Sequence, residues 1–381
     1  MSTSIGMEGW NTVFASVPLA LSFLSILIYA VHVIKWLQRL PSRTEEAVRA
    51  ADTSHRITVV IPCRDEAKRL PLLLQDLAKQ TLPVEVLVVD DHSSDGTRAA
   101  AEAEGVTCID HPGQGKKSAL KHAHFRVKTS WMATLDADVR IGNNWAQSMT
   151  RIIADCPSDR GNPVNAILGT VRIKANARSP WQRFQALEYG CMTTWIEGGV
   201  HGTELAMGSG ANSLYRTDSY PASNLHEDQA SGDDAYALLA IKNNKGRIRW
   251  NHSAEGYATT KPAKNWSDLW NQRARWASKT GVESDRETKI VGLIIAAVHL
   301  GLAISLISAI VFGGMLGYGF LSAIALKTFI DQKLISTAAH RYELSVKAGD
   351  RLLFPWRYAG LVWGAWWYLL RGRVQWKGRR L

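Results

Sequence analysis

The stretch Val84-Glu85-Val86-Leu87-Val88-Val89-Asp90-Asp91-His92-Ser93-Ser94-Asp95-Gly96-Thr97 joins an apolar run to a cluster of acidic and small polar residues. The apolar run is rich in β-branched residues, which is typical of a buried strand, and the polar end predicts a turn and a helix start. Similar short runs lie at residues 57–61, 106–109 and 131–135. Residues 66–79, between the runs at 57–61 and 84–89, have helical leucine spacing. Strands that alternate with helices predict a parallel sheet.

Polar clusters follow three of these predicted strands, at residues 62–66, 90–91 and 136–138. Ligands of parallel sheets bind at the carboxyl ends of the strands, so these clusters predict one site. A single acid after a strand is often only a helix cap, but three such ends favour a functional site. Asp136 and Asp138 project on one side of an extended segment, and two carboxylates can hold Mg²⁺ or Mn²⁺ against a diphosphate.

The segment Gly113–Ser118 is not a P-loop, because Asp110 and Lys117 stand where that motif requires Gly and Ser or Thr. It is better interpreted as a loop whose Lys116 can neutralise a phosphate.

The net charge of +11 is distributed unevenly along the 381 residues. Residues 57–256 hold 22 basic and 23 acidic side chains, whereas the tail 371–381 holds five basic residues and no acid. A nucleic-acid binder carries its positive charge on the folded domain, so the sequence predicts no nucleic-acid partner. Basic flanks beside apolar runs instead predict an anionic membrane surface as a partner.

Three apolar runs outside the central segment are candidate membrane segments. Val13–Ile34 lacks charged side chains and is long enough to cross a bilayer. Residues 290–326 are also uncharged, and the glycines within residues 313–319 predict two short spans joined by a tight turn. Leu352–Leu370 contains four tryptophans and is expected either to span or to lie in the membrane interface.

Basic residues after the first run place residues 57–256 on the cytoplasmic side of a multi-pass protein of the inner or plasma membrane. Two further spans return the chain to the cytoplasm, so a fourth span would put the basic tail outside, against the positive-inside rule. Either the last run is in-plane or re-entrant, or the tail is an exception. The four cysteines have no C-x-x-C spacing, which argues against a zinc site and fits a reducing compartment.

A set of segments, in this order, resembles the family-2 glycosyltransferases with a GT-A fold, which are inverting and metal-dependent. The segments are Val60–Glu66, Val88–Thr97, Gly115–Leu120, Leu135–Asp138, Gly208–Arg216, Gly232–Asp234 and the Gln-x-x-Arg-Trp signature Gln272–Trp276. The ending Val374–Arg379 also resembles the tails of bacterial membrane glycosyltransferases grouped with carotenoid and hopanoid enzymes.

The resemblance implies a role for each matched residue. Asp91, with Asp90, would meet the base or ribose of a nucleotide. Asp138 would ligate Mg²⁺ or Mn²⁺, with Asp136 on the metal or the ribose, and Asp234 would be the general base. The other donor-binding residues would be Pro62, Arg64, Glu66, Lys116, Gln272, Arg273 and Arg275, and the acceptor-binding residues would be Gly208, Gly210, Asp233 and Trp276.

The chemistry of glycosyl transfer requires such side chains. The acceptor hydroxyl loses a proton as it attacks the anomeric carbon, which calls for a positioned carboxylate. A divalent cation and guanidinium groups stabilise the leaving diphosphate, and Trp276 offers an apolar face to the acceptor.

The general base has a second candidate, because Glu227-Asp228 has the Glu-Asp letters usual in the family whereas Asp233 replaces the usual Glu before Asp234. We favour Asp234, because residues 233–242 are predicted to begin a helix with apolar residues packed behind it, while Asp228 lies in a polar loop. Helix N-capping is the structural alternative for Asp233 and Asp234.

The predicted fold class is therefore α/β, with a Rossmann-like, mostly parallel GT-A domain and one N-terminal and two to three C-terminal transmembrane or interfacial helices. The predicted division is an anchor at 1–39, a linker at 40–56, the catalytic domain at 57–256, an interfacial helix region at 257–289, and membrane segments with the basic tail at 290–381.

The expected function is transfer of one sugar from a nucleotide-sugar, by family habit a UDP-sugar, to a lipid hydroxyl or carboxyl. The lipid acceptor is inferred from tryptophans, since ten of the 15 lie in or beside the predicted membrane segments. The acceptor classes are polyprenol, carotenoid, sterol-like and diacylglycerol lipids. Two alternatives remain open: a processive polysaccharide synthase of the cellulose, hyaluronan or poly-N-acetylglucosamine kind, and a catalytically silent membrane scaffold that binds sugars.

Overall fold

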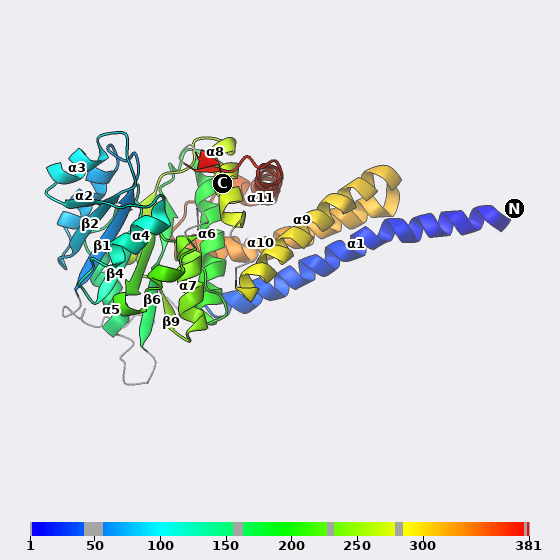
Figure 1. Ribbon diagram of the computed structural model, residues 1–381. Coiled ribbons are helices and arrows are strands. Elements are labelled where there is room, and N and C mark those ends of the chain that lie inside the picture. The colour runs from blue at the N-terminus through cyan, green and yellow to red at the C-terminus, as the bar shows by residue number, and fades with distance from the viewer. Residues whose placement is uncertain are drawn as a thin grey trace.

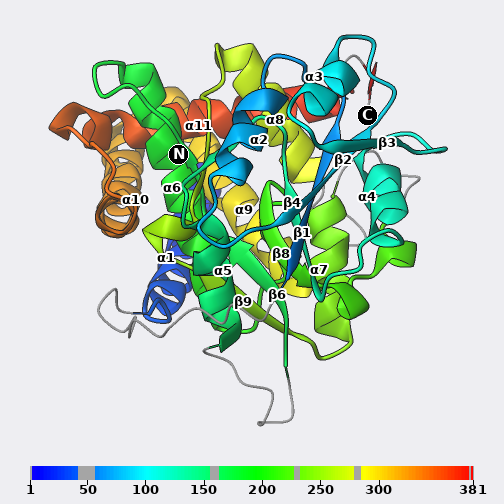
Figure 2. The same cartoon turned by 90° about the vertical axis from the view of Figure 1, so that its left-hand side faces the viewer.

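A seven-stranded sheet forms the centre of the α/β part of the molecule (Figures 1 and 2). The structure, a computed structural model, describes residues 2–41, 56–154, 163–226, 232–278, 285–376 and 379–380. The strand order is β3-β2-β1-β4-β8-β6-β9. The strands are β1 (Ile57–Cys63), β2 (Glu85–Asp90), β3 (Thr107–Asp110), β4 (Trp131–Leu135), β6 (Val164–Gly169), β8 (Asn212–Arg216) and β9 (Arg247–Asn251).

The sheet is parallel except for β8, which pairs antiparallel with both β4 and β6. The four strands predicted from apolar runs are therefore confirmed as β1 to β4, and so is the mostly parallel α/β class. A small second sheet has the order β5-β10-β7 and contains β5 (Arg140–Ile141), β10 (Ala258–Thr260) and β7 (Val171–Ile173). β11 (Gln375–Trp376) and β12 (Arg379–Arg380) pair with each other.

Helices cover both faces of the large sheet because successive strand residues alternate between two apolar clusters. On one face lie α2 (Leu70–Ala78), α3 (Thr97–Ala103) and α5 (Trp145–Ala154). On the other lie α4 (Lys116–His124), α6 (Pro180–His201) and α7 (Asp233–Asn243). In β1, Val59 and Ile61 belong to the first cluster and Val60 to the second.

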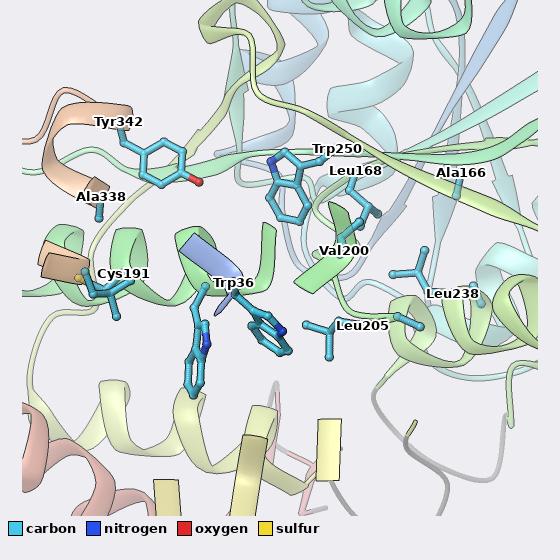
Figure 3. Close-up of a cluster of buried hydrophobic side chains, with 14 of the residues drawn as sticks. Trp36, Ala166, Leu168, Cys191, Val200, Leu205, Leu238, Trp250, Ala338 and Tyr342 are labelled. Atoms are coloured by element: carbon cyan, nitrogen blue, oxygen red, sulfur yellow. The ribbon is translucent and has the colours of Figure 1, made fainter. Parts of the chain in front are cut away.

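The second cluster also contains residues of the long helices that project from the domain, among them Trp36 and Ala338 in Figure 3. Trp36, near the end of α1 (Ser2–Leu37), is fully buried together with Val200 of α6 and Trp250 of β9. Gly198 of α6 makes this approach possible, because a Cβ at that position would lie 2.3 Å from the carbonyl oxygen of Trp36. The projecting helices and the sheet therefore share one core.

Three helices form an extended bundle on one side of the domain: α1, α9 (Arg286–Phe312) and α10 (Gly314–Arg341) (Figure 1). Among the described residues, Ser16–Leu37 and α9 are long and apolar enough to cross a membrane. The turn between α9 and α10 is formed by Gly313 and Gly314, which both have positive φ angles.

The prediction of two apolar segments joined by a tight turn within residues 290–326 agrees with α9 and α10, which are joined at Gly313 and Gly314. The second helix is longer than predicted, because it resumes at Gly314 and continues to Arg341. Gly319 lies inside that helix, where a Cβ would lie 2.2 Å from the side chain of Leu19 in α1. This glycine serves close helix packing rather than a turn. The linker expected at 40–56 lies largely outside the described residues.

Helix α6 connects the sheet to the C-terminal helices through three buried carboxylate–guanidinium pairs. Near its N-terminus, Arg183 donates to Asp350 of α11 (Ala348–Leu370) at 2.6 and 3.0 Å. In its middle, Glu188 accepts from Arg273 of α8 (Trp266–Ala277).

The third pair lies near the C-terminus of α6. Glu197 accepts from Arg341 at 2.5 and 2.9 Å and from the Tyr342 hydroxyl at 2.9 Å. Each of the paired side chains is buried. Buried charges are tolerated only when they are paired, so these contacts define how the helices dock.

We predict that Arg341→Met destabilises the protein by about 3–5 kcal/mol, because it leaves the Glu197 carboxylate buried without its guanidinium partner. The double change Arg341→Met with Glu197→Leu is expected to recover much of this loss. The measurement is the unfolding midpoint in detergent. The matched control is Arg216→Met, which removes a surface pair with Asp218 and is expected to cost less than about 1 kcal/mol. Equal effects of the two single changes would contradict the prediction.

Candidate functional site

A cavity of about 420 Å³ opens at the carboxyl ends of β1, β2 and β4. Most residues predicted for the site line it, although they come from distant parts of the chain. These residues are Pro62, Arg64, Glu66, Asp91, Lys116, Asp136, Asp138, Gly208, Gly210, Asp233, Asp234, Gln272, Arg275 and Trp276.

At one end of the cavity, Asp91 is fixed by two neighbours of its carboxylate. Its Oδ1 accepts from the backbone N–H of Gly115 at 2.7 Å and contacts His111 Nε2 at 3.2 Å. Its Oδ2 is buried and accepts no hydrogen bond from the described residues, with Arg64 Nη1 4.0 Å away. Burial opposes ionisation, but these hydrogen bonds outweigh it and lower the pKa of Asp91. The free oxygen is placed to accept from a ligand.

Sequence reasoning missed His111, which is buried beside Asp91. The available signal was its position, since it directly follows β3, the strand that pairs with β2 in register Asp90 to Asp110.

In the middle of the cavity, the Lys116 ammonium connects three elements. It donates to Asp136 Oδ1 at 2.7 Å and to the Gly210 carbonyl at 3.3 Å, and it lies 3.2 Å from Asp233 Oδ2. Burial opposes its charge, but the attraction of Asp136 and Asp233 outweighs burial and raises the pKa of Lys116. The lysine therefore stays charged at neutral pH and is suited to hold an anionic ligand.

Asp234 lies at the first turn of α7, as the sequence predicts, after Gly232 with φ 94°. Its Oδ2 accepts from the Gly210 N–H at 3.2 Å and its Oδ1 from the Ala235 N–H at 2.9 Å. Both hydrogen bonds come from the backbone, so the carboxylate is held in place beside the cavity. The competing Asp228 lies outside the described residues.

Asp138 contacts an arginine side chain that the sequence did not mark as part of the site. Arg69, the residue before α2, lies 3.5 Å from Asp138 Oδ2 and pairs with both oxygens of Glu66 at 2.6 Å. The guanidinium thus links the loop after β1 to the Asp136-x-Asp138 segment after β4. Its signal in the sequence is weak, because a charged residue before a helix is common on protein surfaces.

Asp136 and Asp138 could hold a divalent cation only together with oxygens of a bound nucleotide-sugar or other ligand. Asp136 and Asp138 offer hard oxygens to the cavity, but among the described residues they do not belong to any group of three metal-ligating side chains. Oxygens of a diphosphate would have to complete the coordination.

Two predicted donor-binding residues are not among those that line the cavity. Asp90 Oδ1 accepts from the N–H and hydroxyl of Ser93 and so closes the turn after β2. Arg273 is turned toward Glu188 of α6 and stacks on the ring of Trp276, with its guanidinium carbon 4.2 Å from the ring centroid. Its place is therefore behind Trp276.

Arg275 takes the position that the sequence analysis gave to both arginines. Its side chain lines the cavity and makes no hydrogen bond or ion pair within the described part of the chain. Burial lowers the pKa of Arg275, opposed by the charges of Asp136, Asp233 and Asp234. A guanidinium that lines the cavity opposite these carboxylates is suited to bind a phosphate in a two-pronged manner.

One side of the cavity, which we call the apolar end, is formed largely by apolar side chains. Tyr189, Met192 and Ile196 come from one face of α6, and Ala206 and Met207 come from the loop before β8. Thr288, in the first turn of α9, also lines the cavity, together with Asp285, which accepts from the Ala206 N–H and the Thr288 hydroxyl. The cavity therefore reaches the start of the projecting helix α9.

Comparison with known proteins agrees with this geometry. Residues 58–219 match the model of the family described as Glycosyl transferase family 2. The 4,4'-diaponeurosporenoate glycosyltransferase of Staphylococcus haemolyticus is 35% identical over 105 residues, which are 26% of this chain and 28% of that protein. The protein of the same name from Staphylococcus aureus strain MRSA252 is 36% identical over 89 residues, 22% of this chain and 24% of that protein. The matched region thus spans about a quarter of the length of these relatives.

Among solved structures, the mannosyltransferase of Pyrobaculum calidifontis in complex with GDP-Man and Mn²⁺ is similar with a TM-score of 0.55 at 17% identity. The similarity covers 94% of this chain and 99% of that one, and at this identity it concerns the fold.

We predict that Asp91→Asn weakens nucleoside diphosphate binding by about 10- to 100-fold, because hydrogen bonds to a charged group contribute about 1.5–3 kcal/mol. Asp90→Asn is the matched control. It changes the adjacent aspartate, which closes a turn outside the cavity, so binding is expected to change less than about threefold. Titration calorimetry with UDP and with GDP measures both. Equal losses of affinity in the two variants would contradict the prediction that Asp91 contacts the nucleotide and Asp90 does not.

Proposed function

We propose that this chain, whose residues 58–219 match the model of Glycosyl transferase family 2, transfers one sugar from a nucleotide-sugar to a membrane lipid. The observation that carries the proposal is the continuity of the cavity. It joins Asp91 at a polar end, the carboxylate of Asp234 and the apolar wall of α6 in one space. A site of this composition can hold a sugar donor and an apolar acceptor side by side.

At the donor end, Asp91 and Arg64 would hold the nucleoside, and Lys116 and Arg275 would hold the diphosphate. A family-2 donor is by habit a UDP-sugar, while the structural relative contains GDP-Man. Uracil has an imide N–H and guanine an amide N–H, and either could donate a hydrogen bond to Asp91 Oδ2.

Asp234 would act as the general base. As the acceptor hydroxyl attacks the anomeric carbon, its proton passes to Asp234, the new glycosidic bond forms, and the bond to the diphosphate breaks with its electron pair. Lys116 and Arg275 would stabilise the negative charge that develops on the leaving group. Attack from the face opposite the diphosphate inverts the anomeric centre.

A divalent cation fits between Asp136 and Asp138 and the diphosphate, and Mn²⁺ accompanies the nucleotide-sugar in the structural relative. When bound, Mg²⁺ or Mn²⁺ would supply Lewis-acid stabilisation of the leaving diphosphate. Arg69 and Lys116 contact the same two carboxylates and would yield to the cation or share them with it.

The lipid acceptor is supported by the apolar end of the cavity, which meets α9. The relatives' names specify a diaponeurosporenoate acceptor, so we propose a carotenoid-type or similar lipid with a terminal hydroxyl or carboxyl. Its chain would lie against Met192 and Ile196, and its polar end would reach Asp234, with Gly208, Gly210, Asp233 and Trp276 around it.

We also propose that the protein is anchored in a bacterial cell membrane through α1 and the hairpin of α9 and α10. The apolar length of α1 and α9 supports this, as do their side chains, many of which are exposed although hydrophobic. The catalytic domain would lie on the cytoplasmic side, next to the basic residues that follow α1.

The test of the function is incubation of the full chain in membranes with a panel of labelled nucleotide-sugars, followed by lipid extraction and mass analysis. One sugar added to each lipid is the expected product. A long polymer would instead support a polysaccharide synthase. Absence of both turnover and donor binding would support a silent scaffold.

We predict that Asp234→Asn abolishes transfer, a loss of at least about 10³-fold, because the acceptor hydroxyl loses its base. Asp228→Asn is expected to retain transfer. Both rates are measured with the same donor, and the unfolding midpoint shows that each variant is folded. The opposite result would make Asp228 the base.

A second prediction concerns the apolar wall. Ile196→Gln is expected to raise the KM for the lipid acceptor by about 5- to 150-fold, because a polar group replaces about 1–3 kcal/mol of apolar contact. Hydrolysis of the donor by water is expected to stay unchanged. The control is Ile152→Gln on α5, a half-buried isoleucine outside the cavity. If the control raises the acceptor KM equally, the wall does not bind the acceptor.

A further inference from the structure

Helix α11 has one face covered by the catalytic part and one face exposed. The covered face includes Phe354, Leu361 and Ala365, which are buried. The exposed face is formed by large hydrophobic residues at helical spacing, and we call it the α11 stripe: Leu352, Leu353, Trp356, Trp363, Trp367 and Leu370. Leu352 and Leu370, at its two ends, are 69% and 87% exposed. An apolar face of this length in water requires a partner.

Both ends of α11 are attached to the catalytic part. At the beginning, Asp350 forms the buried pair with Arg183 of α6. After the end, Val374 is buried against Ala274 of α8. A helix that crosses a bilayer leaves its two ends on opposite sides, whereas these two ends contact the same domain.

The middle of α11 is attached to α8 as well. The indole N–H of Trp270 donates to the Gly360 carbonyl at 3.0 Å, and the hydroxyls of Ser267 and Tyr368 lie 2.6 Å apart. Gly364 permits this contact, because a Cβ there would lie 2.1 Å from Trp270 Nε1. Contacts along the whole helix leave no part of it free to enter the bilayer core at a steep angle.

The direction of α11 is also unlike that of the bundle. In Figure 1, α1, α9 and α10 are seen from the side, whereas α11 is seen along its axis. In Figure 2, which is turned by 90°, α11 runs across the picture, whereas the bundle helices point along the line of sight. α11 therefore lies across the bundle, and it is on the side of the domain from which the bundle projects. If the bundle runs through the membrane, α11 lies in the plane of the membrane surface.

The chemistry of the stripe matches the interface between lipid headgroups and acyl chains. Tryptophan is enriched there because its ring is apolar and its N–H is polar. Arg371 follows the stripe with its guanidinium 3.9 Å above the ring of Trp367, and Arg373 is exposed beside it. Basic side chains next to an apolar helix face attract anionic lipid headgroups.

We propose that α11 is an in-plane membrane helix whose stripe is embedded in the interface of a bilayer containing anionic lipid. The proposal rests on the membrane anchoring proposed above. It places the C-terminal tail on the same side as the catalytic domain, which agrees with the positive-inside rule. It also holds α8, which carries Gln272, Arg275 and Trp276, directly behind the membrane surface, so that the cavity opens at the depth of a lipid's polar end.

The first test is the topology of the full chain in cell membranes, with a peptide tag after Leu381. In inside-out vesicles the tag is expected to be cleaved by external protease, as is the catalytic domain, and in intact spheroplasts both are expected to be protected. A tag cleaved only in spheroplasts would overturn the proposal, because α11 would then span. Loss of the chain from the membrane in alkaline carbonate would contradict the anchoring instead. Neither result depends on catalytic activity.

The second test measures depth by fluorescence quenching in vesicles with phosphatidylglycerol, using lipids brominated near the headgroup or near the chain end. We compare the full chain with the variant Trp356→Phe/Trp363→Phe/Trp367→Phe. The tryptophan emission that these changes remove is expected to be quenched at least about twofold more by lipids brominated near the headgroup than by lipids brominated near the chain end. The control is Trp131→Phe in β4, a buried strand residue whose emission no lipid should quench.

Stronger quenching by the deep bromines would show a spanning helix. Absence of lipid quenching of the stripe would show that something else covers it. A second copy of the chain would be that cover if crosslinked dimers disappear in Leu352→Glu/Leu370→Glu. Either outcome would overturn the proposal.

Discussion

The burial of three carboxylate–guanidinium pairs along α6 is the constraint on which the rest of the molecule depends. One partner in each pair belongs to α6, and the others belong to α11, α8 and the end of α10. A charge that is buried without its partner is costly, so each pair excludes alternative dockings of the helix that it holds. The helices α8, α10 and α11 are thereby fixed relative to the sheet, and with them the residues that line the cavity.

The same helix contributes both to the cavity and to the packing of α1. Glu188 holds Arg273, which supports the ring of Trp276, while the adjacent Tyr189 and Met192, one turn further on, line the cavity. Near the end of α6, Trp36 of α1 is buried against Gly198 and Val200. Helix α1, the apolar wall of the cavity and the Gln-x-x-Arg-Trp helix are therefore parts of one packed unit. If α1 is the membrane anchor proposed above, its distance from the site is set by packing rather than by a flexible tether.

Local sequence patterns predicted much of the catalytic half. The strands β1 to β4 and the start of α7 at Asp233 follow from apolar runs and a turn, which depend on residues near each other in the chain. The second C-terminal helix is longer than the sequence predicted, and long-range packing is the reason. Residues 314–341 form a single helix because Gly319 packs on Leu19 and because Lys327 and Asp331 neutralise each other inside the protein. No local signal distinguishes such glycines from those of a turn.

The site shows the same division. The motifs Asp90-Asp91 and Arg273–Arg275 each contain two chemically equivalent residues, and the sequence alone determined that these segments approach the site. Only the tertiary structure decided that Asp91 and Arg275 line the cavity while Asp90 closes a turn and Arg273 pairs with Glu188. It also brought in Arg69 and His111, which no motif marks. The physical reason is that the chemistry of a side chain is encoded locally, whereas the group it faces is set by elements packed from distant parts of the chain.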